Sequence, residues 1–533
     1  MTRAVIVWLL VGFGVAVLGS QSTGWGQATA PLVQVSETSP FGPLENCGNF
    51  PGVVAGTGIN FLNSEIEPWV EVNPTDPHNI VALWQQDRWS NGGARSNVAG
   101  VSFDSGATWE TVVVPGLTDC SGGAFERATD PWLAFAPDGT LHQISLLLNI
   151  DPPPTFPGGF GPNALAVSKS TDGGLTWSAP VLIMADDNPR FLNDKESITA
   201  DPADANLVYA VWDRLALTPD GADFRGPAYF ARTTDGGDTW EPARVLFDPG
   251  LNNQTIGNQL VVLPNGWLLT FFNEIVNQPT PLPFFLSFVF SPDKGVTWVP
   301  SRHQAIRTNL IQSLGVSTPD KGVPVRDADI LFDVAVDRNS GKVYAVWQDA
   351  RFTGFDQIAF SQSKTLGFVW SNPIKINLTP ANAENPRRQQ AFLPSVVVTS
   401  DGMVVVTYYD FRNDTPTGEL TDHWLIRCHT DCTDPVNWGN EVRLSETSFD
   451  YLQAPFANGA FIGDYVGLAA QGTQAVAFFP QAFAEDHTSV FFRQVGLSEA
   501  ESGGVRRAPA PVPSGEVAAA GPPQKRPAMW IRR

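Results

Sequence analysis

The sequence predicts an all-β protein, a β-propeller of four-stranded blades, and three observations support this prediction. A turn motif recurs four times, a strand-like segment recurs seven times, and the last repeat is one strand short. Seven copies of the segment favour seven blades, with six blades as the alternative. The 48 glycines and 44 prolines suit many short strands joined by turns.

The turn motif has the form Ser/Thr-x-Asp-x-Gly-x-Thr-Trp. Its four copies are residues 102–109, 170–177, 233–240 and 291–298, and degenerate copies end at Trp370 and Trp438. The aspartate accepts hydrogen bonds from nearby backbone N–H groups, and the glycine adopts a conformation closed to other residues. We expect the tryptophan to leave the turn and pack between blades. The motif therefore predicts structure rather than chemistry.

Two strand-like segments precede each motif, and the second is the more regular. The second segments are residues 80–84, 207–212, 267–272, 343–347, 404–409, 474–479 and, more weakly, 141–148. Their β-branched and aromatic residues are typical of strands. After the last of them only one further strand, residues 490–495, is expected, and no motif follows. The last blade therefore lacks its fourth strand.

The N-terminus of the mature chain is expected to supply this missing strand. Residues 33–39 read Val-Gln-Val-Ser-Glu-Thr-Ser and closely parallel residues 442–448, which stand where the sixth blade's fourth strand belongs. We therefore predict a ring closed by the N-terminal strand, because this closure removes the free sheet edges.

The two ends of the chain differ in composition from the repeats. Residues 1–28 are typical of a signal peptide, with Arg3, an apolar run over residues 4–18 and small residues before the expected cleavage site. Residues 498–533 are rich in proline, alanine and glycine, carry basic residues and are predicted to be a disordered tail. The propeller is then expected over residues 31–497, in a secreted or periplasmic protein.

The four cysteines are expected to form two disulfides. An even cysteine count in an exported protein favours disulfides over free thiols. Of the three connectivities we prefer Cys428–Cys432 within one loop and Cys47–Cys120 across the first blade.

The formal net charge of −21 disfavours nucleic acids and anionic membranes as partners. After the signal peptide no segment is long and apolar enough to span a membrane, and we expect a monomer. No cofactor or metal motif is present. Ca²⁺ is the ion that an acidic rim would suit after export, although no loop has suitable ligand spacing.

Asp-Arg pairs follow the second strand-like segment in several repeats. They are Asp87-Arg88, Asp213-Arg214, Asp349 with Arg351, and Asp410 with Arg412. Together with Arg127 and Arg326, these arginines are candidates for binding a substrate carboxylate in a bidentate manner. The alternative is that the repeated pairs are structural ion pairs between neighbouring blades.

Acidic residues recur at or just before the first strand-like segment, namely Glu67, Asp130, Glu196, Asp329 and Asp464. Loops that enter the first strand and leave the second lie on one face of a propeller, so both groupings should converge around its central channel. Carboxylates there can act as general acid or base. The catalytic candidates are Asp130, Glu196, Asp464 and Tyr465, which is either a nucleophile or a packing residue.

The four motifs are Asp boxes, and over residues 31–497 the chain resembles the sialidase superfamily of proteins with BNR repeats. In that family three arginines bind the sialate carboxylate, an aspartate is the acid/base, and a Tyr–Glu pair attacks the anomeric carbon. The family's first arginine lies in an F/Y-R-I-P motif. The equivalent region here reads Glu65-Ile-Glu-Pro-Trp69, without arginine.

The resemblance implies an exported glycan-active protein, a glycoside hydrolase of which an exo-α-sialidase is the specific form. The competing interpretation is a non-catalytic propeller that binds glycan or protein on its channel face, because Asp boxes also occur in such proteins and fold does not settle function. A polysaccharide lyase would need a His–Tyr pair, and the six histidines show no motif for one.

Overall fold

The computed structural model describes residues 29–47, 58–150, 159–277, 283–416 and 418–497. Within these residues the protein is all-β, with strands from Val33 to Gly496 and no α-helix. Short 3₁₀ turns connect some strands: η1 (Asp119–Ser121), η2 (Pro386–Gln389), η3 (Pro435–Asn437) and η4 (Tyr451–Gln453). The predicted signal peptide, residues 1–28, and the predicted tail, residues 498–533, lie outside the described residues.

The strands follow one another in antiparallel runs of four. The first run is β2 (Glu65–Val72), β3 (Ile80–Arg88), β4 (Ala94–Ser102) and β5 (Glu110–Val113). The second run is β6 (Arg127–Phe135), β7 (Leu141–Leu148), β8 (Asn163–Ser170) and β9 (Val181–Asp186). These two runs form one sheet because Ala94 pairs with Ala128.

The next four runs each form a separate sheet. The third run is β10 (Phe191–Ala200), β11 (Val208–Leu217), β13 (Ala228–Thr233) and β14 (Arg244–Phe247), and β12 (Phe224–Arg225) pairs with β11. The fourth run is β15 (Gln254–Val262), β16 (Leu268–Ile275), β17 (Phe284–Ser291) and β18 (Ile306–Ile311), and the fifth is β19 (Phe332–Val336), β20 (Val343–Asp349), β21 (Gln357–Ser363) and β22 (Ile374–Lys375). The sixth run is β23 (Ala391–Val398), β24 (Val404–Asp410), β25 (Leu420–Cys428) and β26 (Gly439–Arg443), and β27 (Phe449–Asp450) pairs with β25.

The last sheet combines the two ends of the described chain. Its strands are β28 (Gly467–Gln471), β29 (Gln474–Phe483), β30 (His487–Gly496) and β1 (Val33–Gln34). Val33 pairs with Phe492 and Gln34 with Phe491, so the N-terminal segment contributes the fourth strand of this sheet.

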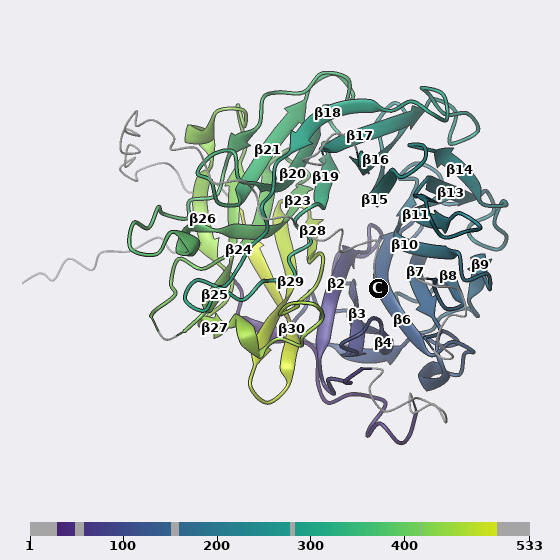
Figure 1. Ribbon diagram of the computed structural model, residues 1–533, viewed down its shortest axis with the longest axis horizontal. Helices are drawn as coiled ribbons and strands as arrows, with labels where there is room; N and C mark the ends of the chain where they lie inside the picture. The colour runs from purple at the N-terminus through teal and green to yellow at the C-terminus, as the bar shows by residue number, and fades with distance from the viewer. Residues whose placement is uncertain (1–28, 48–57, 151–158, 278–282, 417, 498–533) are drawn as a thin grey trace, which may run out of the picture.

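The first strand of every run faces the middle of the molecule, where β2, β6, β10, β15, β19, β23 and β28 surround a common centre (Figure 1). Neighbouring first strands lie against each other in chain order, and β28 lies against both β23 and β2. Buried apolar side chains fill the spaces between successive sheets, as Phe271 and Trp347 do between the β15 and β19 runs. The centre is therefore lined by one strand from each run.

We call residues 102–109, 170–177, 233–240 and 291–298 the repeat turns. In each, the first hydroxyl accepts a hydrogen bond from the glycine N–H, and the aspartate accepts from the backbone and hydroxyl of the threonine. For Asp172 these bonds to Thr176 are 2.9 and 2.5 Å. The hydroxyl and the aspartate of each turn are thus bonded within the turn itself, as predicted.

The tryptophans that end the turns pack against the preceding sheet. The ring of Trp298 lies 5.1 Å from Phe230, and that of Trp438 lies 4.8 Å from Phe360. Trp109 lies 5.7 Å from Phe478, which places the first run against the last. This confirms the predicted packing between neighbouring repeats.

Both preferred disulfides, Cys47–Cys120 and Cys428–Cys432, are present. The first ties the segment after β1 to η1, and the second closes the loop after β25. No helix in the described part of the chain is long and apolar enough to cross a membrane.

Candidate functional site

Bulges interrupt five of the seven central strands at matching positions. The register with the second strand shifts between Ile66 and Trp69, Thr129 and Trp132, Asp194 and Ser197, Ile256 and Gln259, and Phe392 and Ser395. The residue at each bulge has a positive φ: Glu67 50°, Asp130 49°, Lys195 48°, Gly257 68° and Leu393 52°. A bulge re-aims its side chain, so these positions can direct charged groups toward one point.

Three of the bulge side chains meet Asp464, which precedes β28. The Lys195 ammonium lies 2.6 Å from Asp464, 3.1 Å from Asp130 and 3.6 Å from Glu67. The backbone N–H of Asp464 donates to Glu67 at 3.0 Å. Arg326 donates to Asp464 at 2.8 Å. We call these five residues the channel cluster.

The cations keep two carboxylates of the channel cluster ionised. Burial opposes ionisation of Asp464, but Arg326 and Lys195 outweigh it and hold the pKa of Asp464 far below its usual value. Burial likewise opposes ionisation of Asp130, and Lys195 brings the pKa of Asp130 below its usual value. Burial disfavours the charged form of Lys195, yet Asp130, Asp464 and Glu67 raise the pKa of Lys195.

The pKa of Glu196, the residue after Lys195, is shifted in the opposite direction to those of Asp130 and Asp464. Burial, and then the charge of Asp130, raise the pKa of Glu196 well above its usual value. Its side chain is 3% exposed, and neither oxygen has a hydrogen-bond partner on another described residue. A protonated carboxyl and the ionised Asp130 therefore lie in one environment, an arrangement that separates acid from base.

These groups line a cavity of about 40 Å³ together with an aromatic wall. The rings of Trp69 and Trp132 are stacked with centroids 3.4 Å apart, and Tyr465 meets Trp132 edge-on at 5.3 Å. The Tyr465 hydroxyl donates to the Pro131 carbonyl at 2.9 Å. Burial, and then the charges of Glu67 and Asp130, raise the pKa of Tyr465, so it is a neutral hydroxyl. A cavity of this size holds about three water molecules.

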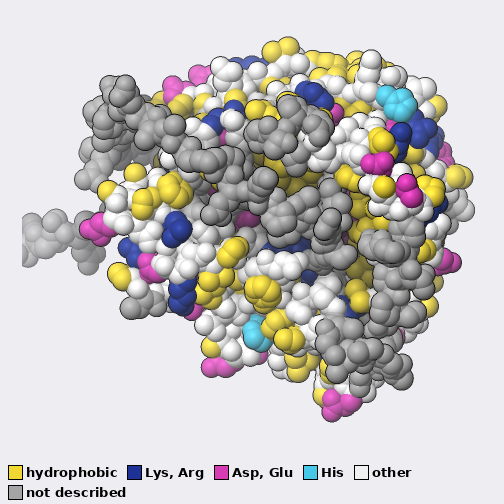
Figure 2. Space-filling model, in the orientation of Figure 1, with side chains coloured by type: hydrophobic (Ala, Val, Ile, Leu, Met, Phe, Trp, Pro, Cys, Tyr) yellow, Lys and Arg dark blue, Asp and Glu magenta, His cyan; other side chains and the backbone are white. Residues whose placement is uncertain are grey.

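A wider cavity of about 330 Å³ continues the channel beyond Trp69 and Trp132. Both cavities share these tryptophans, Gln259 and Asp333. Glu71 lines the wider cavity, and burial, opposed by the indole of Trp69, raises the pKa of Glu71 to about 7. Over the face shown in Figure 2, acidic and basic side chains are interspersed.

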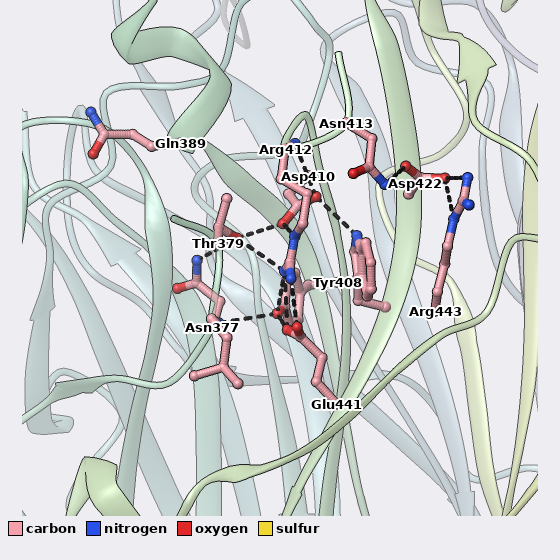
Figure 3. A network of polar contacts seen from close by, with 12 residues as sticks. Asn377, Thr379, Gln389, Tyr408, Asp410, Arg412, Asn413, Asp422, Glu441 and Arg443 are labelled. Atoms are coloured by element: carbon pink, nitrogen blue, oxygen red, sulfur yellow. Dashed lines mark hydrogen bonds and ion pairs between the residues drawn. The ribbon is translucent and has the colours of Figure 1, made fainter. Parts of the chain in front are cut away.

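The arginines of the later Asp-Arg pairs form ion pairs outside the lining of this cavity, and Arg214 does so with Asp186 rather than with its neighbour Asp213. Arg214 binds Asp186 of the preceding run at 2.5 Å, and Arg351 binds Asp349 at 2.6 Å. Arg412 lies between Asp410, at 2.6 Å, and Glu441, at 2.5 Å (Figure 3). Its guanidinium lies over the Trp424 ring. The structure thus gives these three arginines the contacts expected of ion pairs within and between repeats.

The other three predicted arginines, Arg88, Arg127 and Arg326, each have different contacts. Arg88 donates to Gln85 at 2.8 Å and lies over Phe461. Arg127 donates to the Gly92 carbonyl at 2.7 Å and lies over Trp89. Arg326 is paired with Asp464 at 2.8 Å and so belongs to the channel cluster.

The cavity therefore brings together Asp130, Glu196, Asp464 and Tyr465, the four residues predicted as catalytic. It also contains residues that the sequence analysis missed, above all Lys195 and Asn258. The dipeptide Pro-Trp recurs in Glu67-Pro-Trp69 and Asp130-Pro-Trp132, and this repetition could have indicated the bulges from the sequence. No such signal marks Lys195, which occupies the matching position with the opposite charge.

No group of three or more His, Cys, Asp or Glu residues suited to a metal ion occurs in the described ranges. Three carboxylates of the channel cluster instead face the Lys195 ammonium. The cluster is therefore organised around a cation of the chain itself.

Comparison with known proteins gives one partial relative. No family model matches the chain. The sialidase of Micromonospora viridifaciens is 31% identical over 190 residues, which are 32% of this chain and 28% of that protein. The chain thus spans under a third of the length of the curated relative it matches.

Solved structures of similar outline share little sequence with this chain. An α-L-arabinanase of Penicillium chrysogenum is 13% identical with a TM-score of 0.44, covering 88% of this chain and 98% of that one. A sialidase of Streptococcus pneumoniae is 13% identical with a TM-score of 0.38, covering 81% and 68%.

Proposed function

We propose that the protein is an exported glycan-active enzyme, a glycoside hydrolase that works at the cavity of the channel cluster. One observation carries the proposal: Glu196, whose pKa is raised by burial and by Asp130, lines the same cavity as Asp130, whose pKa Lys195 lowers. Two carboxyl groups held in opposite states are what glycosidic bond cleavage requires.

In this proposal Glu196 is the general acid. It gives its proton to the glycosidic oxygen as the bond from that oxygen to the anomeric carbon breaks. The ionised carboxylates of Asp130 and Asp464 stabilise the positive charge that develops on the sugar. Water then attacks the anomeric carbon, and Asp130 accepts the proton that this water releases.

The aromatic wall supports a sugar ligand. Trp69, Trp132 and Tyr465 offer apolar surface beside the charged groups, and a mainly apolar wall with a few polar groups is typical of small-molecule sites. Because its hydroxyl donates to Pro131, we assign Tyr465 to this wall rather than to nucleophilic attack.

We further infer that the runs of strands are seven blades of one ring closed by β1. The contacts of β28 with both β23 and β2 support this inference, as does the pairing of β1 with β30. Export is supported by the two disulfides, since disulfides persist in oxidising compartments.

The test is a panel of chromogenic glycosides, one of them an α-sialoside, because the partial relative is a sialidase. The native chain is compared with Glu196→Gln and with Glu110→Gln, which changes an exposed glutamate. We expect the native chain and Glu110→Gln to hydrolyse at least one glycoside and Glu196→Gln to be severely impaired. Glycan binding without turnover of any glycoside would instead establish the second candidate, a non-catalytic binding propeller.

A further inference from the structure

Two buried polar side chains in the cavity lack hydrogen-bond partners. Asn258 is 1% exposed and Glu196 is 3% exposed, and both line the cavity. No other described residue forms a hydrogen bond with the side-chain oxygen or nitrogen of Asn258, or with either carboxyl oxygen of Glu196. Buried polar groups are almost always paired, and leaving one unpaired lowers stability. Two residues with such unpaired atoms line one cavity, which points to a polar ligand.

The backbone holds Asn258 in place while its amide stays unpaired. Asn258 follows Gly257, which has a φ of 68°, at the bulge of β15. The Ser197 hydroxyl donates to the Asn258 carbonyl at 2.8 Å, which ties β15 to β10. The amide can both donate and accept hydrogen bonds, and a sugar hydroxyl does the same.

The charges beside Asn258 disfavour an anionic ligand. Lys195 contacts three carboxylates and Arg326 is paired with Asp464, so the cations of the channel cluster are engaged by carboxylates of the chain. A sugar carboxylate would have to separate one of these buried pairs and would then face Asp130 and Asp464, which these cations keep ionised. Breaking a buried pair leaves an uncompensated charge, which is strongly unfavourable.

We propose that the cavity binds an uncharged sugar, whose hydroxyl groups bond to the Asn258 amide and the Glu196 carboxyl, and that it rejects sugars with a carboxylate. This specificity rests on the proposed function only in taking the ligand to be a glycan. It makes Asn258 a specificity-determining residue, and it predicts that a sialic acid is not the sugar bound here.

The test measures binding by the full chain with calorimetry and ligand-observed NMR. The probes are methyl glycosides of neutral pentoses and hexoses and, separately, N-acetylneuraminic acid. The variants are Asn258→Ala and, as a matched control, Asn265→Ala, which changes an exposed residue of the same run. We expect a neutral glycoside to bind, Asn258→Ala to weaken it about tenfold, the effect of losing one hydrogen-bonded group, and Asn265→Ala to leave it unchanged.

Thermal unfolding of the same variants separates this role from a structural one. If Asn258 serves a ligand, Asn258→Ala removes an unpaired buried amide and should keep or raise the melting temperature of the chain without sugar. A lower melting temperature together with unchanged sugar affinity would overturn the inference.

The outcomes distinguish this inference from the proposed function. Neutral sugar binding without turnover of any glycoside would leave the inference standing and remove the hydrolase proposal. Binding or hydrolysis of sialosides at least as good as that of neutral sugars would overturn the inference and leave the hydrolase proposal standing. Failure of every probe to bind, with only water in the cavity, would also overturn the inference.

Discussion

The Asp410 network and the channel cavity contain the same kinds of residue but differ in how fully these are bonded. In the network, Asp410 accepts hydrogen bonds from Thr379, Arg412 and Trp424 (Figure 3). In the cavity, the oxygens of Glu196 have no hydrogen-bond partner on another described residue. A set of charges that satisfies itself stabilises the fold, whereas unpaired buried groups mark a place for a ligand.

The two regions also differ in whether their residues recur from repeat to repeat. Asp-Arg pairs recur in several repeats and hold each repeat together or join it to its neighbour, as Arg214 does with Asp186. Lys195 has no counterpart at the other bulges, where the matching residues include Glu67 and Asp130. A ligand does not share the symmetry of the repeats, so the residue that departs from the repeat is the one expected at a site.

The largest effect on stability is expected for Lys195→Met. This change leaves Asp130, Asp464 and Glu67 close together without their shared cation, and losing one partner of a buried ion pair costs about 4 kcal/mol. Urea unfolding would measure the loss. Lys169→Met, which removes a surface pair with Asp238, is the control and should cost under about 1 kcal/mol. Equal losses would mean that the channel cluster contributes no more than a surface pair.

Arg412→Ala should lower the free energy of unfolding by about 3 kcal/mol, because it leaves Asp410 and Glu441 without their cation. Turnover per folded molecule should not change, since Arg412 lies outside the cavity. Arg307→Ala, at a half-exposed arginine paired with Glu274, is the control. Loss of turnover with retained stability would move the Asp-Arg pairs back into the functional site.

Stability should fall in both regions as pH rises from about 4 to 6. Burial raises the pKa of Asp410 in the network and of Asp333 at the cavity to about 6, against about 3.9 in the unfolded chain. The folded state therefore binds these protons more tightly, and their contribution is present at low pH and is lost between about pH 4 and 6. Melting temperatures should decline between about pH 4 and 6, with a shallower slope in Asp333→Asn. A rise over this range would contradict the assignment.

The smallest effect is expected at a repeat turn. Asp172→Ala removes the two hydrogen bonds to Thr176 at an exposed position and should cost about 1 kcal/mol without changing turnover. The control, Asp187→Ala, changes an exposed aspartate outside the turns and should have no measurable effect. A change in sugar binding by Asp172→Ala would show that the turns do more than shape the sheets.

Local bonding explains which parts could be predicted from the sequence. The repeat turns close within a few residues, so their motif predicts them directly, and the tryptophan that ends each turn predicts packing on the preceding sheet. Asp130, Glu196 and Asp464 could be found because acids recur at the first strand. Lys195 and Asn258 could not, because their roles depend on bulges that turn side chains toward partners far away in the chain. The arginines after the second strand could be recognised from the sequence, but their partners on other strands could not be predicted.

The most direct test of the account is the pH dependence of kcat/KM for the glycoside that the native chain cleaves best. If Glu196 is the proton donor, the native rate should fall on the alkaline side as Glu196 loses its proton. Glu196→Gln should lose about 10²- to 10⁴-fold and show no such fall, while Glu110→Gln should follow the native curve. A Glu196→Gln variant with the native rate and the native alkaline fall would contradict the claim that this cavity is the site of hydrolysis.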